Sequence, residues 1–369
     1  MYRNSWIQID VDALRGNVRK LKALTQKKFI AVIKANGYGN GDVEIAKACL
    51  KSGADMLAVS SLDEALSIRH AGIDAELLIL GYVDPLHLSL CQKENITVTA
   101  VSLRWVQNAV QQECRGLKVH MKVDTGMNRL GFKELDDLKQ GLSLLKKRGV
   151  NVTGIFTHFV CSDVSDDQMT NCQMQRFESV LDHLDDSFEW IHCCNSDASV
   201  HYHETRSNAV RCGIAMFGIT SYETDLENVM SLYTKIVHVK KVHAGETIGY
   251  GATYTAQKDE IIATVPIGYA DGWIRRHQGR KAYVNGQEAE FVGRICMDQA
   301  MLRLEKWEEE GTLVELIGEH ISLKRAAEEL DTIPYEVMTL LSDRLTKVYM
   351  KKGSYSDEFT PRFERAEEL

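Results

Sequence analysis

The stretch AVIKANGYGNG at residues 31–41 begins with an apolar, partly β-branched run that ends in Lys34, and three alternating glycines follow. This pattern predicts a strand that breaks into a tight turn, with an amine at the break. A lysine at the end of a barrel strand can bond covalently to a carbonyl cofactor, and Tyr38 is close enough in sequence to contact that cofactor's phosphate. Taken alone, the pattern also fits a surface lysine after an edge strand.

Seven further apolar runs follow, separated by longer segments of helical period. Together with the first run they predict strands at 29–34, 56–60, 76–81, 96–102, 117–123, 152–158, 189–195 and 208–213. Eight strands that alternate with helices indicate parallel βα units and therefore a (β/α)8 barrel. In that fold the chemistry lies at the C-terminal ends of the strands, and the loops after strands seven and eight bind phosphate.

The ends of the last two runs fit this rule. Run seven ends in Asn195 and Ser196, and run eight ends in Arg211, followed by Gly213 and Ile214. A serine hydroxyl can donate to phosphate, and a glycine lets the backbone approach an anion closely. For either run alone, the alternative is that these are ordinary residues at the end of a strand and the start of a loop.

After about Thr224 the pattern changes to strands and turns. The segment 232–242 has period two, and KAYVNGQEAEF at 281–291 contains Asn285 and Gly286, a strong signal for a two-residue hairpin. We therefore expect a second, mostly β domain after the barrel. Its aromatic and polar motifs are IGYGATY, PIGYADGW and GRICMDQ, for most of which core packing and turn formation are the alternative.

Composition narrows the function class. The 369 residues exceed the roughly 250 to 300 of a single core, so two domains are expected. The net charge of −8 and the scattered basic residues argue against a nucleic-acid partner, and no apolar run is long enough for a membrane span. The nine cysteines are odd in number and irregularly spaced, with Cys193 and Cys194 adjacent, which predicts reduced thiols and a cytoplasmic protein. The dispersed histidines predict no metal site.

Read together in chain order, the motifs resemble those of alanine racemases. They are AVIKANGYGNG, KVDTGMNRLG, THF, NS, VRCGIAMFG, IGYGATY, VPIGYADGW, GRICMDQ and TIPYEV, and they cover nearly the whole chain. The resemblance implies a barrel at 10–225 that binds pyridoxal 5'-phosphate (PLP) and a β-rich domain at 226–369, on which residues 1–9 pack. It also implies a homodimer whose active sites use residues of both chains.

By the same resemblance, Lys34 holds PLP covalently and is one of two catalytic bases, and Tyr250 of the second subunit is the other. Racemisation by two bases needs groups on opposite faces of the α-carbon, since a proton leaves one face and returns to the other. His158 resembles the histidine that links the tyrosine towards Arg211. The Arg211 guanidinium corresponds to the group that contacts the pyridine nitrogen of PLP, which would then stay unprotonated.

The remaining site residues follow from the resemblance. Arg129 corresponds to the arginine that contacts PLP and the substrate carboxylate, Met297 to a partner residue whose amide meets that carboxylate, and Lys122 to a lysine that is often carbamylated. The phosphate ligands would be Tyr38, Asn195, Ser196 and the backbone of Gly213 and Ile214, and the substrate corridor would contain Asp163, Tyr269 and Arg294.

Asp343 departs from the family pattern. It lies where some members carry a tyrosine, and LTK follows where VPR is frequent. A carboxylate cannot donate a hydrogen bond and would repel a nearby phosphate, so it either points away or makes the corridor wider and more polar. We expect a PLP-dependent enzyme that interconverts L- and D-alanine and supplies D-alanine for peptidoglycan. A serine racemase or one of broader specificity is the alternative, followed by a PLP-binding protein without catalysis.

Overall fold

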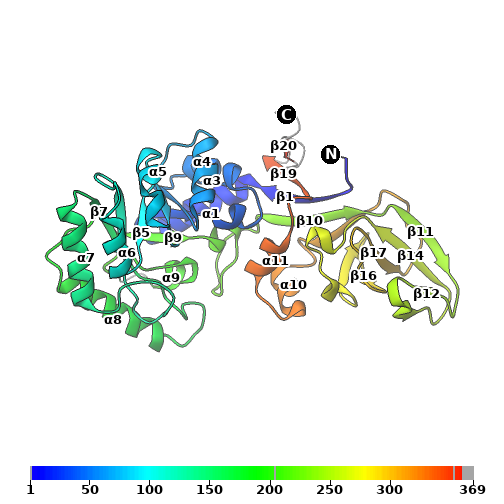
Figure 1. Ribbon diagram of the computed structural model, residues 1–369. Helices are drawn as coiled ribbons and strands as arrows, with labels where there is room; N and C mark the ends of the chain where they lie inside the picture. The colour runs from blue at the N-terminus through cyan, green and yellow to red at the C-terminus, as the bar shows by residue number, and fades with distance from the viewer. Residues whose placement is uncertain (1, 203–204, 352–353, 360–369) are drawn as a thin grey trace. The chain divides into compact units, whose positions relative to one another are not determined.

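The computed structural model describes residues 2–202, 205–351 and 354–359 and divides into two units (Figure 1). The barrel unit comprises Ala13–Gly37 and Asp42–Glu227, and the β-rich unit comprises Met1–Asp12, Tyr38–Gly41 and Asn228–Leu369. The last ten residues of the expected second domain, 360–369, lie outside the described residues. Within the described ranges, no helix combines the length and the apolar character that crossing a membrane requires.

Eight parallel strands form the sheet of the barrel unit, in the order β4-β3-β2-β9-β8-β7-β6-β5. The sheet nearly closes on itself, because β4 meets the start of the β5 segment through a bridge between Leu78 and Thr97. This confirms the predicted (β/α)8 barrel. The strands are β2 (Lys28–Val32), β3 (Met56–Val59), β4 (Leu77–Ile79), β5 (Val98–Ala100), β6 (Lys118–Lys122), β7 (Asn151–Phe156), β8 (Trp190–His192) and β9 (Ala209–Cys212).

Helices flank these strands (Figure 1). They are α1 (Val11–Thr25), α2 (Lys34–Tyr38), α3 (Asp42–Lys51), α4 (Leu62–His70), α5 (Leu88–Lys93), α6 (Leu103–Ala109), α7 (Leu135–Lys147), α8 (Gln168–Asp182) and α9 (Ser196–His201), with the 3-10 turns η1 (Pro85–His87) and η2 (Ile214–Phe217).

Alternation along the strands decides which side chains the barrel encloses. Ile30 and Val32 of β2 pack in one buried cluster with Ala209 of β9. Since side chains two positions apart share a face of a strand, this register brings Arg211 to the face of Ala209 at the C-terminal end of β9. The strand ends thus supply the polar residues of the candidate site.

The β-rich unit contains a ten-stranded sheet in the order β11-β14-β17-β16-β15-β18-β10-β1-β19-β20. Strand β1 lies inside it, antiparallel to β10 and parallel to β19. Its strands are β1 (Ser5–Asp10), β10 (Met230–Lys235), β11 (His238–Val242), β14 (Glu260–Val265), β15 (Lys281–Val284), β16 (Gln287–Phe291), β17 (Ala300–Leu304), β18 (Leu313–Ile317), β19 (Thr346–Lys351) and β20 (Ser354–Phe359).

A smaller pair of strands and several helical segments complete this unit. They are β12 (Thr247–Ile248), β13 (Tyr254–Thr255), α10 (Leu323–Leu330), α11 (Pro334–Leu340), η3 (Tyr250–Ala252), η4 (Tyr269–Asp271) and η5 (Arg275–His277). The predicted hairpin is present: Asn285 and Gly286 have φ angles of 44° and 91° and connect β15 to β16. The period-two segment 232–242 is not one strand, because β10 ends at Lys235 and β11 begins at His238.

Candidate active site

The chain after Lys34, the segment labelled α2, is a left-handed turn and not a right-handed α-helix. Ala35, Asn36, Gly37 and Tyr38 have φ angles of 53°, 54°, 59° and 54°. The sequence predicted a tight turn built on glycines, but three of these residues carry a side chain that disfavours this conformation by about 1–2 kcal/mol each, somewhat less for asparagine. Such local strain is typical of sites where the surrounding structure fixes the backbone for function.

Glu64, on the first turn of α4, holds the start of this turn. One carboxylate oxygen accepts from the backbone of Ala35 at 2.8 Å and the other from the backbone of Ser60 at 2.7 Å. Burial lowers the pKa of the neighbouring Lys34 amine, the positive charges of Arg129 and Arg211 act in the same direction, and Glu64 opposes them. The result favours a neutral, nucleophilic amine.

Arg211 is the centre of the polar network inside the barrel. Its side chain is 3% exposed. Nη1 donates to Nδ1 and the carbonyl oxygen of His192 at 2.8 and 3.0 Å, and Nη2 donates to the carbonyls of Thr157 and Cys193 and to Nδ1 of His158 at 2.9, 3.0 and 3.1 Å. Burial lowers its pKa to about 10, which leaves it charged at neutral pH. Five acceptors therefore fix the plane of a buried cation.

A chain of imidazoles, which the sequence analysis did not single out, extends from this guanidinium. Because Nδ1 of His192 accepts from Arg211, its Nε2 carries the proton and donates to Nδ1 of His120 at 3.0 Å. In the described part of the chain, Nε2 of His120 has no hydrogen-bond partner. Burial lowers the pKa of His120 to about 3 and that of His192 well below its usual value, with Arg211 acting in the same direction on both. Both rings are thus neutral.

Replacing His192 by leucine should destabilise the protein by about 2–3 kcal/mol at pH 7, because it removes an acceptor from a buried charged donor. At pH 5 the difference in the free energy of unfolding between the parent protein and the variant should be smaller. The unfolded chain protonates its histidines below pH 6.5, whereas buried His192 stays neutral. Lowering the pH from 7 to 5 therefore reduces the free energy of unfolding by about 2 kcal/mol for each buried imidazole of this kind. The variant lacks the His192 imidazole and so loses less stability than the parent protein. Urea unfolding at pH 7 and pH 5 measures the stability of both proteins, and His183→Leu, at an exposed histidine, is the control. A stability difference between parent and His192→Leu that is the same at both pH values would contradict the prediction.

Lys122 lies beside Arg211 at the end of β6 and is 5% exposed. Its Nζ is 5.2 Å from the centre of the Phe156 ring, and the Arg211 guanidinium is 5.3 Å from the same ring. Burial lowers the pKa of Lys122 to about 7, and the charges of Arg211 and Arg129 add to this effect. His158 is subject to the same influences, since burial and then Arg211 lower its pKa well below its usual value.

Hydrogen-bond donors suited to an anion gather at the ends of β8 and β9. The backbone amides of Gly213 and Ala215 lie 3.0 and 3.3 Å from Oγ of Ser196. Asn195 caps α9 through its side chain, which also accepts from the hydroxyl of Ser162 at 2.7 Å. Ser196 and the turn after β9 are therefore in contact, as a shared phosphate site requires.

The second group of predicted residues lies in the β-rich unit. Gly249 and Gly251, with φ angles of 75° and 72°, flank Tyr250, and both approach Arg294. The backbone of Tyr269 donates to the carbonyl of Cys296 at 3.0 Å, next to Met297. Tyr250, Tyr269 and Met297 are 71%, 42% and 52% exposed. These side chains form an open surface rather than a closed site.

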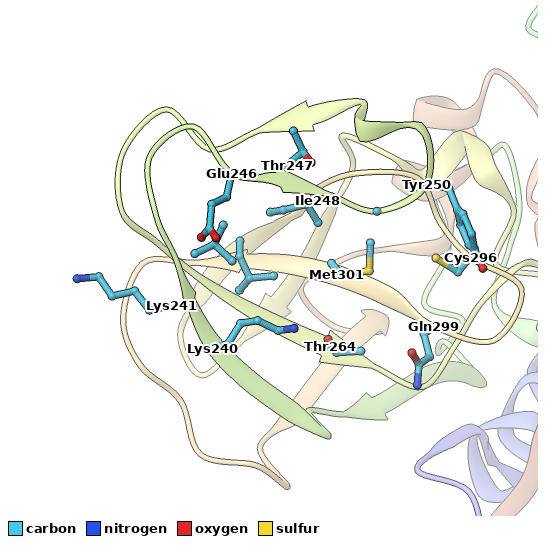
Figure 2. A pocket seen from close by; sticks show the side chains of 13 residues that line it. Lys240, Lys241, Glu246, Thr247, Ile248, Tyr250, Thr264, Cys296, Gln299 and Met301 are labelled. Atoms are coloured by element: carbon cyan, nitrogen blue, oxygen red, sulfur yellow. The ribbon is translucent and has the colours of Figure 1, made fainter.

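Tyr250 also borders a cavity of about 600 Å³ within this unit. Figure 2 shows Tyr250 beside Cys296 at one end of the cavity, with Met301 in the middle and Lys240 and Glu246 further along. The tyrosine therefore has open space on one side.

Asp343 has a partner that the sequence analysis did not name. Its Oδ1 accepts from Nζ of Lys347 at 2.8 Å, and the Asp343 side chain is 56% exposed whereas that of Lys347 is fully buried. Lys347 is the lysine of LTK, so the two departures from the family pattern form one ion pair. The spacing of four residues between opposite charges was the available signal.

The structure thus places the predicted residues in two sets. The barrel unit holds Lys34, Lys122, Arg129, His158, Asp163, Asn195, Ser196, Arg211, Gly213 and Ile214. The β-rich unit holds Tyr38, Tyr250, Tyr269, Arg294, Met297 and Asp343. In the barrel unit, burial and the charge of Arg211 both lower the pKa of Lys34, Lys122 and His158. Asp163 is exposed, and its charge adds to the burial that raises the pKa of Asp197.

Comparison with known proteins covers both units. The family profile "Alanine racemase, N-terminal domain" matches residues 9–221, and "Alanine racemase, C-terminal domain" matches residues 229–349. An alanine racemase of Streptococcus pyogenes serotype M5 (strain Manfredo) is 43% identical over 362 residues, which span 94% of this chain and 99% of that protein.

Solved structures agree with these matches. Alanine racemase from Bacillus anthracis with bound L-Ala-P is 36% identical with a TM-score of 0.95 and covers 99% of both chains. Alanine racemase from E. faecalis is 38% identical with a TM-score of 0.91, covering 95% of this chain and 99% of its own. A histidine racemase from Leuconostoc mesenteroides is 30% identical with a TM-score of 0.89, covering 95% and 99%.

Proposed function

The chain belongs to the alanine racemase family and is an amino-acid racemase that interconverts L- and D-alanine, and we propose that it does so with PLP and two bases. The match of both family domains along nearly the whole chain carries this conclusion. The departure at Asp343 does not by itself favour another substrate, because a buried lysine neutralises that carboxylate.

The barrel residues fit PLP. Lys34 offers an amine whose lowered pKa suits a covalent bond to an aldehyde. Arg211 offers a cation with a fixed plane for the pyridine nitrogen, and Ser196 with the backbone of Gly213 and Ile214, joined by Tyr38 and Asn195, would hold the phosphate. When bound, the cofactor withdraws electrons from the amino acid's α-carbon, so that its proton can leave.

Two residues would move that proton. Lys34 would take it from or return it to the D-enantiomer, and Tyr250 would do so for the L-enantiomer, from the opposite face. Arg129 and the backbone amide of Met297 would hold the substrate carboxylate. Arg129 is exposed in the single chain, yet its charge acts on Lys34, Lys122 and His158, which supports a place at the open side of the site.

We further propose a homodimer in which each chain provides Tyr250 to the other. Tyr250 is 71% exposed in the single chain. A tyrosine with the usual pKa of about 10 is a poor base in water and needs an electropositive environment. A second copy would supply that environment through the positive charge of Arg211, to which His158 is hydrogen-bonded. Tyr269, Arg294, Asp163 and Asp343 would then line the substrate corridor.

The product would be D-alanine for peptidoglycan, made in the cytoplasm. The nine cysteines are free thiols, as is typical of proteins from reducing compartments.

Incubating the purified, PLP-loaded protein with L-alanine and with L-serine tests the proposed substrate. Chiral chromatography should show D-alanine forming well ahead of D-serine. Formation of D-serine at a comparable or higher rate would show that alanine is not the preferred substrate. If neither product forms although PLP is bound, the racemase assignment is overturned.

We expect Lys122 to carry CO₂ as a carbamate. Its amine reacts with CO₂ only when neutral, and a pKa of about 7 makes it neutral above that pH. The modification should therefore be present at pH 8 and decline below pH 7. ¹³C NMR of protein in ¹³C-bicarbonate would detect the carbamate carbon. Lys122→Gln should lose the signal and Lys118→Gln, on the same strand, should keep it; a signal absent at pH 8 contradicts the proposal.

A further inference from the structure

Two adjacent thiols lie behind the candidate site and take no part in the proposed reaction. Cys193 and Cys194 follow β8 and are 1% and 0% exposed, with their sulfur atoms 3.7 Å apart. A disulfide needs a separation of about 2.05 Å, so oxidation would require a large local movement. One thiophilic atom bonded to two sulfurs at about 2.3 Å holds them about 3.3–3.8 Å apart, depending on the bond angle. The observed spacing matches that second arrangement.

Hydrogen-bond donors prepare one of these thiols. Nζ of Lys27 donates to Oγ1 of Thr205 at 2.7 Å, and Thr205 and Ser207 hydroxyls lie 2.5 Å apart. Since the lysine occupies an oxygen lone pair of Thr205, the hydroxyl hydrogens can point on to Ser207 and then to the sulfur of Cys193. The hydrogen bond from Cys194, followed by that from Ser207, lowers the pKa of Cys193, although burial opposes the shift.

We propose that Cys193 and Cys194 form a vicinal dithiol site that captures a monosubstituted trivalent arsenical. The organic group fills the third bond of arsenic, so two thiols complete its coordination. Both thiols lose a proton, two S–As bonds form, and the oxide oxygen of the reagent leaves as water. Arsenic stays trivalent, and no oxidant is needed.

Capture should disturb the candidate site through the backbone. The carbonyl of Cys193 accepts from Nη2 of Arg211, and the carbonyl of Cys194 accepts from the backbone of Arg211, both at 3.0 Å. Because both thiols are buried, the added arsenic and its organic group would push the surrounding backbone aside, displace these carbonyls and loosen Arg211. Loss of PLP on labelling is the expected result, and this second step rests on the proposed function of Arg211.

The test treats PLP-loaded protein with phenylarsine oxide and follows intact mass and cofactor absorbance together. One phenylarsenic group per chain should bind slowly, since both thiols are buried, and 2,3-dimercaptopropanol but not 2-mercaptoethanol should remove it. Cys193→Ser and Cys194→Ser should each carry no phenylarsenic label after treatment with 2-mercaptoethanol. Where circular dichroism shows that serine impairs folding, the alanine variant takes its place. Cys172→Ser, which removes an isolated thiol, should label as the parent does.

The outcomes separate the two steps. No stable label on the parent protein, or a label that persists in either single variant, would overturn the dithiol site whatever the activity. A label that depends on both cysteines while PLP stays bound would support the site and overturn its link to Arg211.

Discussion

Replacing Tyr250 by phenylalanine is expected to slow alanine racemisation by roughly 10³-fold while PLP remains bound, because one of two general bases is lost. The two enantiomers have equal free energy, so kcat/KM must fall equally in both directions, and rates alone cannot show which base was removed. Exchange of the α-proton with D₂O can. The variant should still exchange the proton of D-alanine through Lys34 but should lose exchange on L-alanine.

A matched control separates this effect from a general change at the surface. Tyr82 is 55% exposed in the barrel unit and has no proposed role, so Tyr82→Phe should leave both exchange reactions unchanged. If the Tyr250 variant exchanged both enantiomers at the parent rate, Tyr250 would not be the base on the L side. Loss of exchange on both enantiomers would instead mean that the tyrosine positions the substrate.

The barrel and the ends of its strands were predictable because they depend on local patterns. Short apolar runs separated by segments of helical period located all eight barrel strands, and the rule for strand ends brought Lys34, Ser196 and Arg211 to one side of the barrel. The hairpin at Asn285 and Gly286 likewise follows from two residues that tolerate positive φ. These features need no knowledge of distant contacts.

The features that escaped prediction depend on contacts between distant segments. His120 and His192 are 72 residues apart, and only the pairing of β6, β7 and β8 brings their rings together. The left-handed turn at Ala35 is held by Glu64, 29 residues downstream, whereas the glycines alone suggested an ordinary turn. In both cases tertiary hydrogen bonds override local preference, which a single sequence does not reveal.

Arg211→Lys is expected to lower the free energy of unfolding by about 3–5 kcal/mol, because the charge stays buried while most of its acceptors lose their donor. The guanidinium serves five acceptors from one plane, including His192 and His158 through separate nitrogens. A lysine amine is a single point with three donors and cannot reach both imidazoles. Urea unfolding and equilibrium dialysis of PLP should show reduced stability and weaker cofactor binding together.

The comparison variant is Arg206→Lys, in which an exposed arginine that pairs with Asp182 changes in the same way. An exposed ion pair contributes at most about 1 kcal/mol, so this variant should match the parent in stability and in PLP binding. Equal behaviour of the two variants would mean that charge alone matters at position 211. A loss confined to Arg211→Lys would show that the planar fork, held by the imidazoles and carbonyls around it, is what the cofactor site requires.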